Sequence, residues 1–161
     1  MVTLKKTVIV FLLIVIFILV SCNNKSISNH INQSDNIKEE DEMNMNKLLT
    51  LKINNQEIDV TWFDNDSVKA LKELAKDDLT INMHKYSTFE QVGSLGKSII
   101  SSDIEITTSP GDIVLYSSSN IVLFYGSNTW DYTKLGHINL NKTELTELLG
   151  KDDVTISFSL K

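Results

Sequence analysis

Two uninterrupted apolar runs stand in the second half of the chain, and they predict a central β-hairpin. The runs are Ile113–Tyr116 and Ile121–Tyr125, and the polar residues Ser117–Asn120 separate them as a turn. Apolar side chains at consecutive positions indicate strands that are covered on both faces. Such strands occupy the middle of a sandwich or a barrel, so we expect the rest of the domain to pack around this hairpin.

Alternating apolar and polar positions predict six further strands. These cover Leu49–Ile53, Ile58–Trp62, Leu79–Met83, Ile104–Ile106, Thr133–Ile138 and Val154–Leu160. Asn54–Gln56 is expected to join the first two as a hairpin, because Asn tolerates left-handed conformations. Ser109–Asp112 carries Pro and Gly at the positions that a type II turn requires, and it leads into the central hairpin.

Two short helices are predicted among these strands. Ser67–Lys76 has one apolar face, and Asp66 or Ser67 can cap its first N–H groups. The second helix begins at Asn141 with an Asn-x-x-Glu capping box and ends at Gly150.

Eight short strands and two helices too short to form a layer predict a mainly β fold. We expect a closed barrel of about eight strands with the two helices capping its ends, and a sandwich is the alternative. Residues 47–161 form this domain, which is long enough to bury one hydrophobic core. Residues 84–102 show no period and are expected to form an irregular loop, a kind of segment that is often functional.

The N-terminal residues 1–21 have the pattern of a secretory signal peptide. Lys5 and Lys6 precede the apolar run Thr7–Val20, and Leu19–Cys22 resembles the lipobox of bacterial lipoproteins. The resemblance implies a diacylglyceryl group on Cys22, with acyl chains such as palmitate, after cleavage before this residue. We therefore expect the protein on the extracytoplasmic face of the cell membrane, and an uncleaved anchor helix is the alternative.

Residues 22–46 are expected to form a disordered linker between the lipid and the domain. They are rich in Asn and Ser, include the acidic run Glu39–Glu42, and have no apolar period. The alternative is a tail that folds when it contacts a partner.

The charge and composition of the chain limit the kinds of functional site that we expect in it. The chain has 15 lysines, no arginine and a net charge of −6, which disfavours nucleic-acid and phosphate binding. Its single cysteine leaves no disulfide for the domain. His84 and His137 lack partners at zinc-ligand spacing, so neither a metal nor a cofactor is expected.

Aromatic residues around Gly126–Thr129 form the candidate ligand pocket. Tyr125, Trp130 and Tyr132 flank this segment, and Tyr86 and Phe89 can join them from residues 84–102. Aromatic rings with polar tips suit the capture of a peptide or small molecule at a barrel mouth. The alternative is ordinary packing at the rim of the core.

Three short motifs resemble a bacterial family of cyclophilin-like domains, and the similarity extends over nearly all of residues 47–161. The motifs are Gly111-Asp112-Ile113, Leu123-Phe124-Tyr125 and Tyr132-Thr133-x-Leu135-Gly136-x-Ile138. The resemblance implies an eight-stranded barrel closed by two helices, in a family largely without assigned activity.

Cyclophilin isomerases use an arginine that holds the carbonyl of the substrate proline, and this chain has no arginine. A lysine does not reproduce the planar guanidinium fork. We therefore expect a monomeric, non-catalytic binding module for a peptide, a small ligand or an envelope partner. The alternative is an unusual peptidyl-prolyl cis-trans isomerase that acts on secreted proteins.

The lipobox predicts that the wild-type chain, expressed in a bacterium, incorporates a labelled fatty acid and sediments with membranes. Cys22→Ser removes the only thiol, so the label should be lost. Metabolic labelling followed by gel fluorography measures both. Wild-type protein without label, or equal labelling of Cys22→Ser, would contradict lipid attachment.

Overall fold

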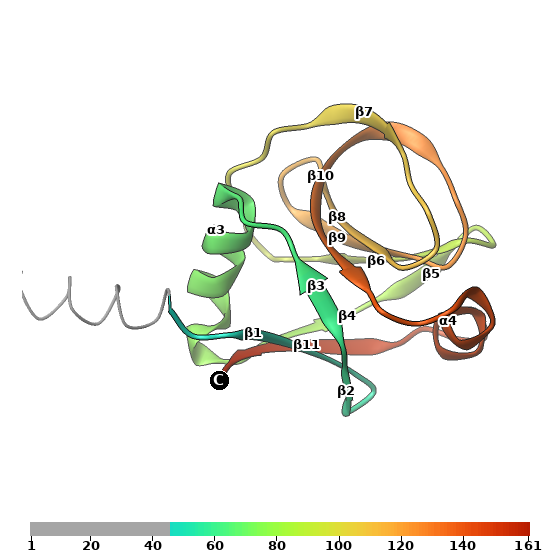
Figure 1. Ribbon diagram of the computed structural model, residues 1–161, viewed down its shortest axis with the longest axis horizontal. Coiled ribbons are helices and arrows are strands. Elements are labelled where there is room, and N and C mark those ends of the chain that lie inside the picture. Colours follow the sequence, from blue (N-terminus) through green and yellow to red (C-terminus); the bar gives the residue numbers. More distant parts are fainter. Residues whose placement is uncertain (1–45) are drawn as a thin grey trace, which may run out of the picture. The chain divides into compact units, whose positions relative to one another are not determined.

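Eleven strands in two antiparallel sheets form the framework of residues 46–161, the part of the chain that the computed structural model describes (Figure 1). The mainly β fold class is therefore confirmed. The predicted signal peptide, Cys22 and all of the linker except Asn46 lie outside the described residues. No helix within residues 46–161 is both long enough and apolar enough to cross a bilayer.

The smaller sheet holds four strands around the two ends of the described chain. Its order is β2 (Gln56–Ile58), β1 (Leu49–Ile53), β11 (Thr155–Leu160) and β4 (Leu79–Asn82). The turn between β1 and β2 is the predicted one, because Asn54 and Asn55 have φ values of 49° and 68°.

The larger sheet holds seven strands and has the predicted hairpin at its centre. Its order is β3 (Val60–Trp62), β10 (Thr129–Ile138), β8 (Asp112–Tyr116), β9 (Asn120–Phe124), β6 (Glu90–Ser94) and β5 (His84–Tyr86), with β7 (Ile104–Thr107) also paired to β10. β8 and β9 pair with Ile113 opposite Leu123, so the central hairpin is confirmed. The turn before it contains Gly111 at φ 99°, as a type II turn requires.

Each face of the central hairpin packs against a different cluster, which explains its uninterrupted apolar runs. Ile113, Leu115, Ile121 and Leu123 are fully buried in the core that the two sheets share. Their neighbours in the sequence point to the other face of the larger sheet. There Val114, Val122, Phe124 and Tyr132 form a second, smaller cluster.

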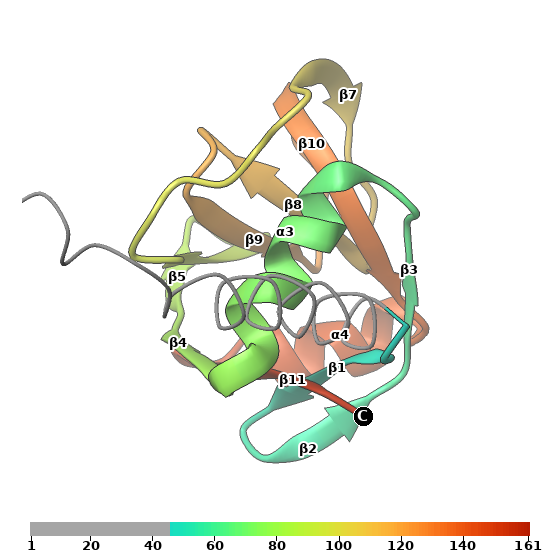
Figure 2. The same ribbon diagram turned by 90° about the vertical axis from the view of Figure 1, so that its left-hand side faces the viewer.

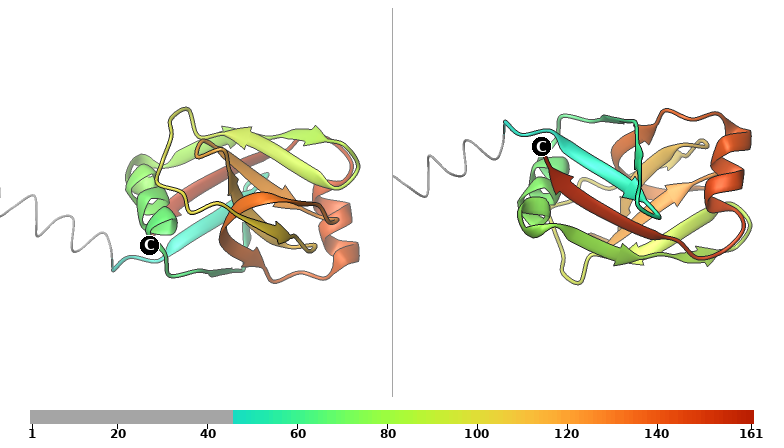
Figure 3. Two further views of the ribbon diagram at one scale, coloured as in Figure 1. Left: turned by 90° about the horizontal axis from the view of Figure 1, so that it is seen from above. Right: turned by 90° about the horizontal axis from the view of Figure 1, so that it is seen from below.

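Two helices lie at opposite ends of the strands (Figure 3). α3 (Asp66–Leu74) continues into a 3-10 turn, η1 (Ala75–Asp77), and α4 (Lys142–Leu149) begins with the predicted capping box at Asn141. The predicted caps of the first helix were wrong. The side chain of Asn65 accepts the hydrogen bond from the Val68 N–H at 2.9 Å, so α3 begins one residue earlier.

Neither sheet closes on itself within residues 46–161, so the closed barrel is not confirmed. The sheets are joined by the chain, which passes from β2 to β3 at Asp59 and from β4 to β5 at Met83. Figure 2 shows β3 leaving the smaller sheet to run beside β10. The predicted strand Ile58–Trp62 was therefore wrong as one element, because its halves pair in different sheets.

The region predicted to be an irregular loop, residues 84–102, instead begins with the β5–β6 hairpin. β6 passes close to β4 at Gly93, where an added Cβ would lie 2.4 Å from the Met83 sulfur. A larger residue at this position would push the two strands apart.

We predict that Leu115→Ala destabilises the chain 41–161 by about 2–5 kcal/mol, because it leaves a cavity in the shared core. This segment forms one compact unit in the structure. Thr80→Ala, on the exposed face of β4, should change the free energy of unfolding by less than about 0.5 kcal/mol. Urea unfolding followed by circular dichroism measures both. Equal effects would show that Leu115 is not in the core.

Candidate functional site

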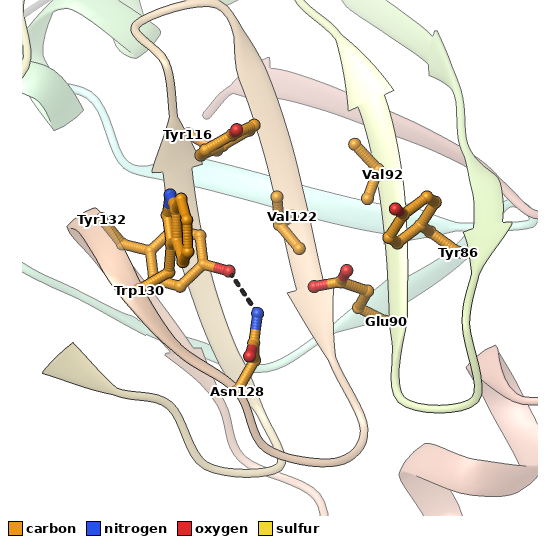
Figure 4. Close-up of a pocket in the computed structure, with 8 residues that line it drawn as sticks. All are labelled: Tyr86, Glu90, Val92, Tyr116, Val122, Asn128, Trp130 and Tyr132. Atoms are coloured by element: carbon orange, nitrogen blue, oxygen red, sulfur yellow. Dashed lines mark hydrogen bonds between the residues drawn. The ribbon is translucent and has the colours of Figure 1, made fainter. Parts of the chain in front are cut away.

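A cavity of about 330 Å³ opens on the second face of the larger sheet, above the smaller cluster (Figure 4). Valines of β6 and β9 contribute apolar surface, and aromatic side chains of β5, β8 and β10 stand around it. The lining residues are Tyr86, Glu90, Val92, Tyr116, Val122, Asn128, Trp130 and Tyr132. The cavity is therefore built on strands on both sides, and only Asn128 comes from a loop.

Strand register places the polar and aromatic groups together. Glu90 lies opposite Tyr86 on β5 and opposite Phe124 on β9. Trp130 and Tyr132 are two residues apart on β10, and so they point to the same face. The β5–β6 hairpin and β10 thus face each other across the central hairpin.

The aromatic walls combine fixed and exposed rings. The Tyr132 ring is buried and makes edge contacts with Phe124 and Tyr116, at centroid distances of 5.7 and 5.9 Å. By contrast, Trp130 is 58% exposed and Tyr86 is 65% exposed. Large aromatic rings left exposed beside a cavity are typical of ligand sites, because a ligand gains contact area there.

Glu90 is the charged group in the lining, and it is only 5% exposed. Figure 4 shows its carboxylate pointing from β6 toward the middle of the cavity. No side chain or backbone group among residues 46–161 donates a hydrogen bond to it or forms an ion pair with it. Burial raises the pKa of Glu90 from its ordinary value of 4.5 to about 7.

The Asn128 amide is held in place at the other side of the cavity. Its Nδ2 donates to the Tyr132 hydroxyl at 3.0 Å, and its Oδ1 accepts from the Thr129 N–H at 2.9 Å. The hydroxyl hydrogen of Tyr132 is thus free to be donated to another group. Burial raises the pKa of Tyr132, and the Glu90 charge adds to this effect.

The structure brings together three of the five residues predicted to line a pocket. Tyr86, Trp130 and Tyr132 line the cavity, whereas Phe89 and Tyr125 do not. Tyr125 follows Phe124 and so faces the shared core, where its hydroxyl has no hydrogen-bond partner. Phe89 stacks on Phe124 at 6.4 Å and supports the smaller cluster from its edge.

The remaining lining residues were not predicted from the sequence. Tyr116 and Val122 lie on strands that were predicted, so their facing could have been inferred from alternation along the central hairpin. Glu90 lies in the segment where no period was found, and a single carboxylate in such a segment gives no signal of burial. Its place in the cavity follows only from the pairing of β6 with β9.

Both histidines of the described residues lie beside carboxylates outside the cavity, one pair at the surface and the other with the buried Asp112. The His84 Nδ1 lies 3.0 Å from an Asp153 carboxylate oxygen, and the His137 Nδ1 lies 3.0 Å from Asp112. Within residues 46–161, no three His, Cys, Asp or Glu side chains are grouped so that they could hold a metal ion.

A family model described as the Cyclophilin-like family matches residues 51–159. This range runs from β1 into β11 and includes every residue that lines the cavity. No match was found among the curated proteins or among the solved structures.

We predict that Glu90→Gln becomes increasingly favourable to stability as the pH rises. The folded state holds the Glu90 proton up to about pH 7, whereas the unfolded state loses it near pH 4.5, so the wild type loses stability between these values. Glutamine does not ionise. The free energy of unfolding of the variant relative to wild type should therefore rise by about 1–3 kcal/mol from pH 5 to pH 8.

Urea unfolding of the chain 41–161 at both pH values measures this difference. Glu147→Gln, on the exposed side of α4, is the control and should show no such trend. A stability difference between Glu90→Gln and wild type that does not change with pH would contradict the burial of the carboxyl.

Proposed function

This chain belongs to the cyclophilin-like family, and from this premise we propose that it is a non-catalytic binding module that captures a peptide or small ligand in the cavity around Glu90. The observation that carries the proposal is a buried carboxyl without a partner inside a cavity whose aromatic walls are exposed. A cavity of this size, with few polar groups on an apolar surface, is typical of small-ligand sites.

The residues present favour binding over chemistry at this site. Besides Glu90, the lining consists of valines, aromatic residues and one asparagine. The chain contains no arginine, and therefore lacks the guanidinium that cyclophilin isomerases place on the proline carbonyl.

We place this module at the outer face of the cell membrane. Lipid on Cys22 would anchor it, and residues 22–46 would give the domain freedom to meet ligands or an envelope partner. The sequence pattern at residues 1–22 supports this location. The acidic chain also supports a role without nucleic acid, and a monomer is sufficient because one copy supplies all the lining residues.

We predict that ligand-observed NMR with pools of peptides and metabolites identifies ligands. Trp130→Ala should weaken the affinity for these ligands by about tenfold or more. The exposed indole forms a wall of the cavity, and an aromatic contact of this kind contributes about 0.5–1.5 kcal/mol in addition to the apolar area that the ligand buries on it. Phe63→Ala removes an exposed ring outside the cavity and should leave binding unchanged.

Two results would contradict the proposal. The first is that no pool contains a ligand whose binding depends on Trp130. The second is catalysis of cis-trans exchange in an Xaa-Pro peptide, measured with the purified protein. We expect no marked acceleration of this exchange. Robust acceleration that is lost in Trp130→Ala would favour the alternative of an unusual peptidyl-prolyl isomerase.

A further inference from the structure

The electrostatic character of the cavity is set by one group. Glu90 is its charged lining residue, and neither lysine nor histidine lines it. The chain as a whole carries a net charge of −6, which adds to attraction of cations over anions. An anionic ligand would meet a carboxylate and no positive charge, so the lining disfavours anions.

The burial of Glu90 leaves an interaction unmade. The Glu90 residue is 5% exposed, and no described residue donates a hydrogen bond to its carboxylate. A carboxylate in this position has reduced hydration and no protein donor in its place, which is unfavourable unless a cation or donor is supplied. A ligand that brings an ammonium group would supply both the opposite charge and the N–H donors.

The walls around Glu90 add a second attraction for the same kind of group. The faces of Trp and Tyr rings attract cations within about 6 Å of the ring centroid. Trp130 and Tyr86 are exposed at the cavity, and Tyr116 is partly exposed there. Figure 4 shows Tyr86 beside Glu90 and the rings of Trp130 and Tyr116 on the far side of the opening.

The rest of the lining fits the carbon chain that would carry the ammonium group. Val122 is an apolar surface between Glu90 and the β10 aromatics, and Val92 adds apolar surface beside Tyr86. The site therefore combines one carboxylate with an adjacent apolar floor, and aromatic side chains surround both. This pattern matches an alkylammonium group better than a bare metal ion, which would require several oxygen ligands.

Resting on the function proposed above, we propose that the ligand of this cavity is an alkylammonium group, whose nitrogen pairs with the Glu90 carboxylate and whose carbon chain packs on Val122 and Trp130. A free primary amine and the lysine side chain of a peptide share this chemistry. The two sources are separated by the arms of the experiment.

The experiment compares cationic probes with neutral probes of the same shape. The full chain, purified in non-ionic detergent micelles, is titrated with 4-phenylbutylammonium and with 4-phenylbutan-1-ol. A second arm uses the peptides Gly-Gly-Lys-Gly-Gly and Gly-Gly-norleucine-Gly-Gly, both acetylated at the N-terminus and amidated at the C-terminus so that the lysine ammonium is the only charge. Saturation-transfer NMR gives the dissociation constants, and empty micelles correct for partition of the probes into detergent.

We expect the wild type to prefer the cationic member of at least one pair by about tenfold or more. Glu90→Gln keeps the size of the side chain and removes its charge, so the preference should disappear. Glu147→Gln removes one negative charge as well, but on the exposed side of α4, and should retain the preference. Preference in the first arm alone identifies a free amine, and preference in the second identifies a lysine side chain.

Equal binding of cationic and neutral probes by the wild type would overturn the ammonium inference and leave the binding module intact. A cationic preference that survives in Glu90→Gln would overturn it as well. Failure of every probe to bind, together with failure of the ligand pools, would instead remove the cavity as a binding site.

Discussion

Burial of the β8–β9 hairpin on both faces is the constraint on which the other features of the domain depend. One face packs into the core between the sheets, and the second face must be covered by other parts of the chain. β10 with β7 and the β5–β6 hairpin stand around that second face but leave an opening between them. The cavity is therefore the part of the second cluster that no side chain fills. This origin explains why its floor is apolar and its walls are aromatic.

Glu90 departs from the rule that a buried polar group has a partner. Its neighbour Gln91 is also buried, and the Gln91 Nε2 donates to the carbonyls of Leu149 and Asp152, whereas the Gln91 Oε1 has no hydrogen-bond partner. Burial raises the pKa of Glu90. Burial also raises the pKa values of Tyr125 and Tyr132, and the Glu90 charge raises both further. Departures of this kind are found where function competes with stability. When Glu90 is ionised, the negative charge in the cavity therefore comes from this one residue, and no lining residue carries the opposite charge.

Local sequence patterns were sufficient for the elements with a clear period or a capping signature. The central hairpin, the turn at Asn54–Asn55 and the capping box at Asn141 were all predicted correctly. The break at Asp59 was not, because alternation continues through it while the pairing partner changes from β1 to β10. β5 and β6 were missed because they are short and their exposed and buried positions do not follow polarity.

The residues of the candidate site also divide into those that could be predicted from local sequence and those that could not. Tyr86, Trp130 and Tyr132 could be predicted from residue type and position, since aromatic residues with polar tips near a turn suggest a pocket. Tyr125 could not be excluded until its neighbour Phe124 was known to face the smaller cluster. Glu90 depends on a strand pairing between segments about 30 residues apart, which one sequence does not reveal.

Substitutions at the floor of the cavity (Val122 and Tyr132) and at its rim (Trp130 and Tyr86) have different effects on folding. Val122 and Tyr132 belong to the cluster that covers the central hairpin, so a substitution there alters folding as well as the ligand. Trp130 and Tyr86 are largely exposed and support little of the packing. New specificities can therefore arise at low energetic risk by exchanging rim residues, while the floor stays fixed. The architecture lets one scaffold diversify toward many ligands without being refolded each time.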